Sequence, residues 1–132
     1  MKRLTLQTTR KTQLLDITEQ VRGASEGRTG RAAVLFVPHT TAGLVIQATG
    51  AGASRVAADI EAALERLVDE GWSYKHIHEG DRNPWAHVRA ALTASSLTIP
   101  LVEGRLAIAD LQAIFFCEFD GPRERTISVS VI

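Results

Sequence analysis

The feature that most limits the fold of this chain is the distribution of its apolar residues, which alternate with polar ones at both ends and recur at helical spacing between them. Near the N-terminus, Leu4 and Leu6 alternate with Thr5 and Gln7, and near the C-terminus three aliphatic residues alternate with two serines. Apolar residues recur every three or four positions over 54–68, as in an amphipathic helix. Strands at both ends with helices between them predict an α+β fold, with a mixed, largely antiparallel sheet and helices packed on one face.

The sequence also predicts where each element lies. Strands are expected at 4–7, 12–17, 31–37, 44–48, 96–100, 105–109, 112–119 and 126–132. Helices are expected to begin at Thr18, Ser54 and Pro84, since serine is a common N-cap residue and proline suits the first turn of a helix. Polar turns favour three hairpins, which pair 4–7 with 12–17, 96–100 with 105–109, and 112–119 with 126–132.

Length and composition limit the class of protein. The 132 residues match the size of one domain, 1–132, which can fold without a disulfide or a structural metal. The net charge is +0 and the basic residues are scattered, so we expect no nucleic-acid partner. Apolar runs are far shorter than the ~20 residues of a membrane helix, so we expect no membrane partner and a cytoplasmic location. Cys117 lies in an apolar run and is expected to be buried.

The histidines fall in two short regions of the chain. His39 follows the apolar run 32–37, whereas His76, His78 and His87 lie in one polar segment downstream. Neutral imidazoles bind zinc and similar divalent metals, and they also transfer protons near neutral pH. His39, His76 and His87 are therefore a candidate metal site if folding brings them together. The alternative is that they are ordinary surface histidines, an interpretation that suits His78 best.

Hydroxyl groups near His39 are candidates for binding an anion. Thr40 and Thr41 lie beside Gly43, where backbone N–H groups suit a phosphate or a carboxylate, although a plain turn also fits. Ser96 offers another hydroxyl just after the helix that begins at Pro84.

Two arginines near the C-terminus carry the planar guanidinium groups that bind phosphate or carboxylate. Arg123 and Arg125 have this geometry. Alternatively, they form surface ion pairs with Glu118, Asp120 or Glu124.

Asp59 lies on the polar side of the helix expected over 54–68. A carboxylate there can accept a hydrogen bond from a histidine and orient it, as metal sites and acid–base sites require. The alternative is a solvated aspartate on the helix surface.

The order of short motifs along the chain resembles that of a known family. The motifs are Pro38-His39-Thr40-Thr41-Ala42-Gly43, Asp59, Tyr74-Lys75-His76, Asp81-x-Asn83-x-x-x-His87, Ser96-Leu97-Thr98-Ile99-Pro100, Gln112, and Glu118-Phe119-Asp120-Gly121-Pro122-Arg123. Together they resemble the YjbQ-like family of secondary thiamine-phosphate synthase enzymes. The resemblance implies an α+β subunit that assembles as a homotrimer. It also implies an enzyme with a weak or secondary ability to join a pyrimidine diphosphate to a thiazole phosphate, which releases pyrophosphate.

With this resemblance, the candidate residues take expected roles. The expected catalytic residues are His39, His87, Asn83 and Asp59. A divalent metal, zinc or magnesium, is expected at His39, His76 and His87. A small phosphorylated ligand is expected to contact Thr40, Thr41, Gly43, Ser96, Gln112 and Arg123.

The chain departs from the family pattern at two places. Gln47-Ala48 stands where members commonly carry Asn-Glu, so a carboxylate that could serve as metal ligand or base is lost. Ala109-Asp110-Leu111-Gln112 stands where members commonly carry Gly-Thr-Trp-Gln. Two other functions therefore stay open: a diverged, non-catalytic trimeric ligand-binding or scaffold protein, and a metal-assisted phosphoesterase that acts on small molecules.

Overall fold

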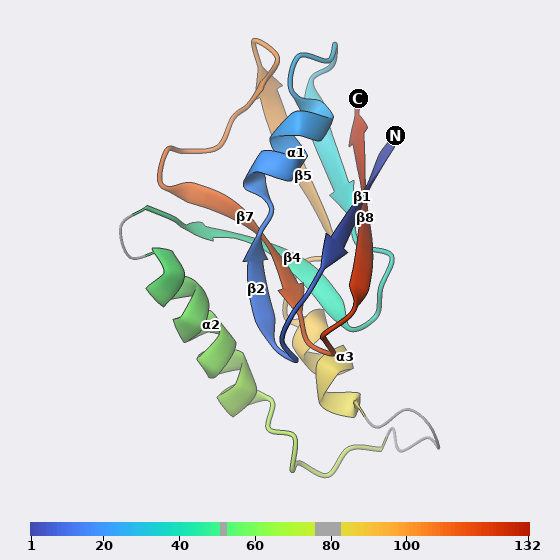
Figure 1. Ribbon diagram of the computed structural model, residues 1–132, viewed down its shortest axis with the longest axis vertical. Coiled ribbons are helices and arrows are strands. Elements are labelled where there is room, and N and C mark those ends of the chain that lie inside the picture. The colour runs from blue at the N-terminus through green and yellow to red at the C-terminus, as the bar shows by residue number, and fades with distance from the viewer. Residues whose placement is uncertain (51–52, 76–82) are drawn as a thin grey trace.

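The computed structural model describes residues 1–50, 53–75 and 83–132 (Figure 1). The strands are β1 (Lys2–Gln7), β2 (Gln13–Asp16), β3 (Ala32–Phe36), β4 (Ala42–Ala48), β5 (Ser96–Val102), β6 (Arg105–Leu106), β7 (Gln112–Glu118) and β8 (Glu124–Val131). The helices are α1 (Thr18–Ser25), α2 (Ala53–Leu67) and α3 (Pro84–Ala91).

The strands form two sheets that share one apolar core. The first sheet has the order β1-β8-β3-β5-β6, and the second has the order β2-β7-β4. Each pairing between these strands is antiparallel. The prediction of an α+β fold with largely antiparallel strands is confirmed, but the strands divide between two sheets. The N- and C-terminal strands β1 and β8 lie side by side, so both chain ends emerge at the same end of the molecule (Figure 1).

Strand β7 explains how the layers are stacked, because both of its faces are buried. Ile114 and Phe116 point into the core between the two sheets. Phe115 and Cys117 point to the opposite face, where they pack against residues of α2 and α3. The continuous apolar run of β7 is therefore the pattern of a strand covered on both sides. Burial also raises the pKa of the Cys117 thiol to about 12, so the predicted buried cysteine is confirmed and stays protonated.

The helices take two different positions. Helices α2 and α3 cover the outer face of the three-stranded sheet, as the prediction of helices on one face requires (Figure 1). Helix α1 instead packs Val21 and Ala24 into the core between the sheets. In the described part of the chain, no helix is both long enough and apolar enough to span a membrane.

A buried arginine fixes α3 against the end of α2. Arg89 is 2% exposed, and its Nε and Nη2 donate hydrogen bonds to the carbonyl oxygen of Val68, at 3.1 and 2.8 Å. The carbonyls at a helix C-terminus carry partial negative charge, so a cation is stabilised there. The contact sets the position of α3, which carries two of the candidate site residues, Asn83 at its N-cap and His87.

Two of the three predicted hairpins are wrong, because the chain crosses between the sheets where the turns were expected. Strand β1 pairs with β8 in one sheet, and β2 pairs with β7 in the other. The two crossings lie together: the N–H of Thr8 donates to the carbonyl of Arg123 at 3.0 Å, and the N–H of Gly121 donates to that of Lys11 at 3.1 Å. We call this region the corner, 8–12 with 119–123. Period-two alternation predicts which face of a strand is buried but not which strand lies beside it.

The third predicted hairpin, between β5 and β6, is confirmed. Its turn residues Glu103 and Gly104 both have positive φ, 52° and 73°, as the tightest hairpin turns require. Strand β6 is much shorter than the expected 105–109.

Candidate functional site

A cavity of about 480 Å³ lies where three distant segments of the chain meet. Its lining comes from the β3–β4 connection, the beginning of α3, and the β7–β8 connection. The lining residues are Pro38, His39, Thr40, Thr41, Asn83, His87, Asp120, Arg123 and Arg125. We call it the histidine cavity, since His39 and His87 both line it. The structure therefore brings together two of the three predicted histidines, along with Thr40, Thr41, Asn83 and Arg123.

His39 lies where the pairing of β3 with β8 stops. The last pair of that ladder is Phe36 with Ser128, and Pro38 then directs the chain away from the sheet. The Nε2 atom of His39 lies 3.0 Å from the backbone N and 3.0 Å from the carbonyl O of Thr126 on β8. The imidazole is thus attached to the sheet through one nitrogen.

The surroundings of His39 favour its neutral form. Its pKa is lowered from the ordinary value of 6.5, first by burial and then by the positive charge of Arg125, with a smaller effect of Arg123. The hydrogen bond with Thr126 and the charge of Glu118 act in the opposite direction but are weaker. At neutral pH the ring therefore offers one N–H donor and one acceptor nitrogen.

A buried ion pair holds Arg125, which lines the cavity, against Glu118. Arg125 Nη2 and Nε donate to the two carboxylate oxygens of Glu118, at 2.5 and 2.8 Å, and Nη2 also donates to Thr41 Oγ1 at 2.7 Å. The side chains are 4% and 0% exposed. Burial acts to raise the pKa of Glu118, but hydrogen bonds from Arg125, the N–H of Asp120 and Thr8 outweigh it and hold that pKa below its ordinary value.

A second, more exposed network lies at the rim of the cavity. Asp120 Oδ2 accepts hydrogen bonds from Asn83 Nδ2 and Arg123 Nη2, both at 2.6 Å. Arg123 Nε also donates to the carbonyl of Asp120 at 2.9 Å. Among the described residues, the Nη1 atoms of Arg123 and Arg125 donate to no protein group. The two Nη1 atoms can therefore donate hydrogen bonds to a ligand, while each guanidinium group also has a carboxylate partner.

The N-terminus of α3 also faces the cavity. Asn83 is its N-cap residue and Pro84 occupies the first turn, where a missing N–H costs nothing. Within the described ranges, no side chain makes a capping hydrogen bond to the helix, and its first turn contains no acidic residue. The partial positive charge of the helix terminus is therefore directed at the region that Asn83 and His87 line.

Two predicted ligand contacts lie on strands away from the cavity lining. Gly43, in β4, is a close-packing position, since a Cβ atom there would lie 1.8 Å from Thr93 Oγ1. Gln112 pairs with Ala48 at the opposite end of the β4–β7 ladder from Glu118. Six residues of strand separate Gln112 from Glu118, which corresponds to about 20 Å.

Ser96 and Asp59 also lie outside the cavity lining. Ser96 is exposed and pairs with Phe36 at the beginning of β5. Asp59 is exposed on α2, as its alternative interpretation predicts. His76, His78 and Asp81 fall outside the described residues.

The expected metal site stays a prediction, because only two of its three ligands belong to the described residues. His39 and His87 line one cavity, whereas the expected third ligand, His76, lies outside the described residues. Within 1–50, 53–75 and 83–132, no three His, Cys, Asp or Glu side chains are grouped so as to hold a metal ion. Two imidazoles are fewer than the three protein ligands typical of a catalytic zinc.

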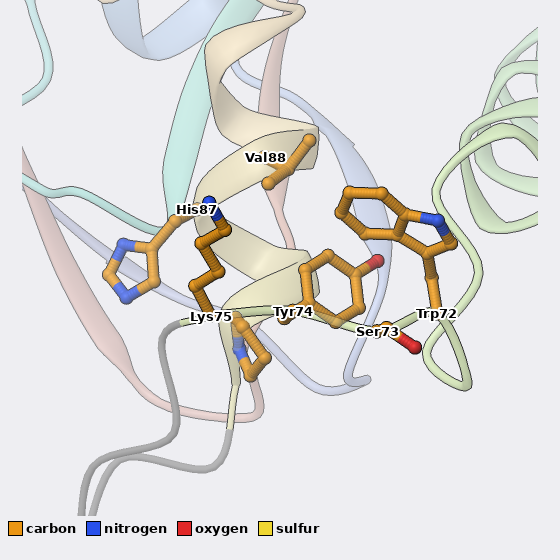
Figure 2. Close-up of a pocket in the computed structure, with 7 residues that line it drawn as sticks. Trp72, Ser73, Tyr74, Lys75, His87 and Val88 are labelled. Carbon is orange, nitrogen blue, oxygen red and sulfur yellow. The ribbon is translucent and has the colours of Figure 1, made fainter.

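A second cavity, of about 690 Å³, lies next to the first and is lined by Trp72, Ser73, Tyr74, Lys75, Pro84, His87 and Val88. We call it the tryptophan cavity. The rings of Trp72 and Tyr74 meet edge to face, with centroids 5.0 Å apart. Figure 2 shows these rings on the side of α3 that carries Val88, while the His87 ring points to the other side. Since His87 lines both cavities, it stands between a polar space and an apolar one.

The sequence predictions missed the structural role of Glu118 and did not include Arg125 among the site residues. The ion pair of Arg125 with Glu118, expected on the surface in the alternative interpretation, is instead buried beside the corner. One signal for it was present in the sequence: Glu118 extends the apolar run of β7, where a carboxylate needs a cation beside it.

Comparisons with known proteins agree with the motif order. Residues 2–132 match the family model described as "UPF0047 protein YjbQ-like". The chain is 40% identical over 129 residues to a UPF0047 protein of Archaeoglobus fulgidus, covering 98% of both chains. It is 33% identical over 138 residues to the UPF0047 protein YugU of Bacillus subtilis, covering 100% of this chain and 98% of YugU.

Solved structures give the same result. A crystal structure of a YjbQ/UPF0047 family protein from Clostridium acetobutylicum superposes with a TM-score of 0.91 at 36% identity, over 100% of both chains. A conserved protein of Thermus thermophilus superposes with a TM-score of 0.86 at 33% identity, also over 100% of both chains. Agreement in sequence and in fold over the whole length places this chain in the YjbQ-like UPF0047 family.

Proposed function

We propose that this protein is an enzyme that binds a small phosphorylated compound in the histidine cavity. His39 donates a hydrogen bond to that compound or accepts one from it. The observation that carries the proposal is the convergence of His39, His87, Arg123 and Arg125, from three separate segments, on one cavity. A cavity with a few convergent polar groups is the default hypothesis for a small-molecule site.

The anion-binding part of the proposal rests on three features of the cavity. Arg123 and Arg125 each leave Nη1 without a protein partner among the described residues. The N-terminus of α3 adds partial positive charge. Thr40 adds an exposed hydroxyl. Charge-assisted hydrogen bonds of this kind suit the oxygens of a phosphate group.

The proposed reaction is the one that the family resemblance implies. A pyrimidine diphosphate is joined to a thiazole phosphate, and pyrophosphate leaves. In that reaction the arginine edges would stabilise the negative charge that develops on the departing pyrophosphate, because preorganised donors stabilise developing charge more than water does. A divalent metal, zinc or magnesium, would supply further charge stabilisation when bound.

The tryptophan cavity supplies the place for the ring of such a ligand. It adjoins the histidine cavity through His87, and its walls include an indole, a phenol ring and the aliphatic Val88. Apolar walls beside a small number of polar groups are typical of small-molecule sites. We therefore assign the phosphate to the histidine cavity and the heterocycle to the tryptophan cavity.

The departure at Ala48 bears on this proposal. Within one subunit, Ala48 pairs with Gln112, about 20 Å along β4 from the end that enters the histidine cavity. A carboxylate restored there by Ala48→Glu is therefore expected to leave ligand binding in the histidine cavity unchanged. The homotrimer that the resemblance implies remains part of the proposal, and light scattering of the purified protein tests it.

The test of the function is an assay for thiamine phosphate made from the two phosphorylated precursors by purified protein, paired with elemental analysis for bound metal. The proposal predicts product from the wild-type protein and a large loss in His39→Ala. If the wild type gives no product yet binds the precursors, a non-catalytic ligand-binding protein replaces the enzyme. If it neither binds them nor forms product, the proposed function fails.

A further inference from the structure

The attachment of His39 to β8 replaces a pair of backbone hydrogen bonds. At the far end of the β3–β8 ladder, Ala32 and Ile132 exchange both of their backbone hydrogen bonds, at 3.1 and 2.9 Å. In an antiparallel ladder, every second pair of residues exchanges both backbone hydrogen bonds in this way. Phe36 and Ser128 are such a pair, so the next one along the ladder would be residue 38 with Thr126.

Residue 38 cannot complete that pair, because proline has no N–H. The N–H and C=O of Thr126 still point toward the edge of β8 that pairs with β3. His39 Nε2 lies 3.0 Å from the N atom and 3.0 Å from the O atom of Thr126. A buried N–H without a partner is costly, so the sheet gains from the imidazole in this position. The ring thus occupies the hydrogen-bonding position on β8 that the backbone of residue 38 would otherwise fill.

We propose that the backbone N–H and C=O of Thr126 position His39 through Nε2, and that Nδ1 is the atom that meets the ligand in the histidine cavity. The proposal rests on the proposed function for the existence of a ligand. The positioning itself does not depend on it.

The backbone N–H and C=O of Thr126 together fit either neutral form of the ring. With the proton on Nδ1, Nε2 accepts the hydrogen bond of the Thr126 N–H, and Nδ1 donates to a ligand oxygen. With the proton on Nε2, that nitrogen donates to the Thr126 carbonyl, and Nδ1 accepts from a ligand hydroxyl. The ring keeps one orientation in both cases, so His39 can act as donor or acceptor toward the cavity without turning.

Two substitutions at His39 separate the roles of its nitrogens. His39→Gln places an amide near the position of Nε2 and has nothing at Nδ1, whereas His39→Asn places an amide near Nδ1 and does not reach Thr126. We expect His39→Gln to keep the wild-type urea midpoint and His39→Asn to lower it. An equal loss of stability in both variants, or a greater loss in His39→Gln, overturns the positioning by Thr126.

The ligand-facing nitrogen is identified by nitrogen NMR of the labelled wild-type protein, with inorganic phosphate as the probe. We expect phosphate to shift the Nδ1 resonance of His39 and to leave Nε2 nearly unchanged. A larger shift at Nε2 overturns the assignment of Nδ1. If neither nitrogen responds while His39→Gln keeps the wild-type midpoint, the ligand part of the proposal and the proposed phosphate site fail together, and the positioning by Thr126 stands.

Discussion

Glu118 and Arg125 form a two-point ion pair, with contacts of 2.5 and 2.8 Å, at the place where the chain crosses between the two sheets. The same carboxylate accepts hydrogen bonds from Thr8 Oγ1 and from the N–H groups of Phe119 and Asp120, at 2.9, 3.0 and 2.9 Å. One side chain therefore joins both strands of the corner. The pair also fixes the guanidinium that forms part of the histidine cavity.

Glu118→Gln is expected to destabilise the protein by about 3–5 kcal/mol, because it leaves the Arg125 charge buried and without a partner. Urea unfolding of the two proteins measures the difference. The matched control is Asp120→Asn, which removes a carboxylate from the half-exposed Arg123 and should cost ~0–1 kcal/mol. Equal costs for the two variants would contradict the central role of the buried pair.

His39 is expected to make the folded state less stable in mild acid. Its folded pKa is below the ordinary 6.5, so the unfolded chain binds more protons between these two values and stability rises with pH there. The contribution is complete above pH 6.5 and is lost as pH falls through the lowered folded pKa. His39→Gln should lack this dependence. Urea midpoints of both proteins from about pH 5 to pH 8 test it, and a constant difference across that range would argue against the shift.

Gly43 is expected to be required for packing. Gly43→Ala places a Cβ 1.8 Å from Thr93 Oγ1 and 3.0 Å from the carbonyl of Ala94, so we expect a loss of about 1–3 kcal/mol. The control is Gly23→Ala in α1, where no atom lies within 4 Å of the new methyl group and helix propensity favours alanine by about 0.5–1 kcal/mol. Thermal unfolding distinguishes them, and an unchanged Gly43→Ala protein would reopen a ligand role for this glycine.

The tryptophan cavity is expected to decide affinity for the ring of the ligand and not for its phosphate. Trp72→Ala should weaken binding of the thiazole phosphate while binding of inorganic phosphate stays unchanged. Leu111→Ala is the control, because Leu111 is similarly exposed, 69% against 67% for Trp72, and lies outside the cavity. Calorimetric titration measures both ligands. Equal affinities of Trp72→Ala and Leu111→Ala for the thiazole phosphate would contradict the assignment of the thiazole ring to the tryptophan cavity.

The elements of the fold were predictable from local patterns, but their assembly was not. The apolar periodicity of 54–68 and the alternation near both ends identified α2, β1 and β8 closely. The division into two sheets was missed, because the corner is held by contacts between residues far apart in sequence, such as Thr8 with Glu118. No pattern within a single strand contains that information.

The candidate site residues that follow a strand or begin a helix could be predicted from the sequence. Those whose role depends on burial could not. His39, Thr40 and Thr41 follow β3, and Asn83 and His87 lie at the start of α3, so turn and helix signals located them. The burial of Arg125 depends on the closing of the corner. The distances of Gln112 and Ala48 from the cavity depend on strand register, which the motif order does not specify.

The most direct test of the phosphate site is calorimetric titration of the thiazole phosphate into the wild type and into Arg123→Ala, with Arg105→Ala as the control that removes an exposed arginine elsewhere. Loss of one charge-assisted hydrogen bond corresponds to about 1.5–3 kcal/mol, or roughly a 10- to 150-fold weaker affinity. We expect saturable binding to the wild type and to Arg105→Ala, and a loss of this size in Arg123→Ala. No binding to the wild type, or equal affinity in all three proteins, would contradict it.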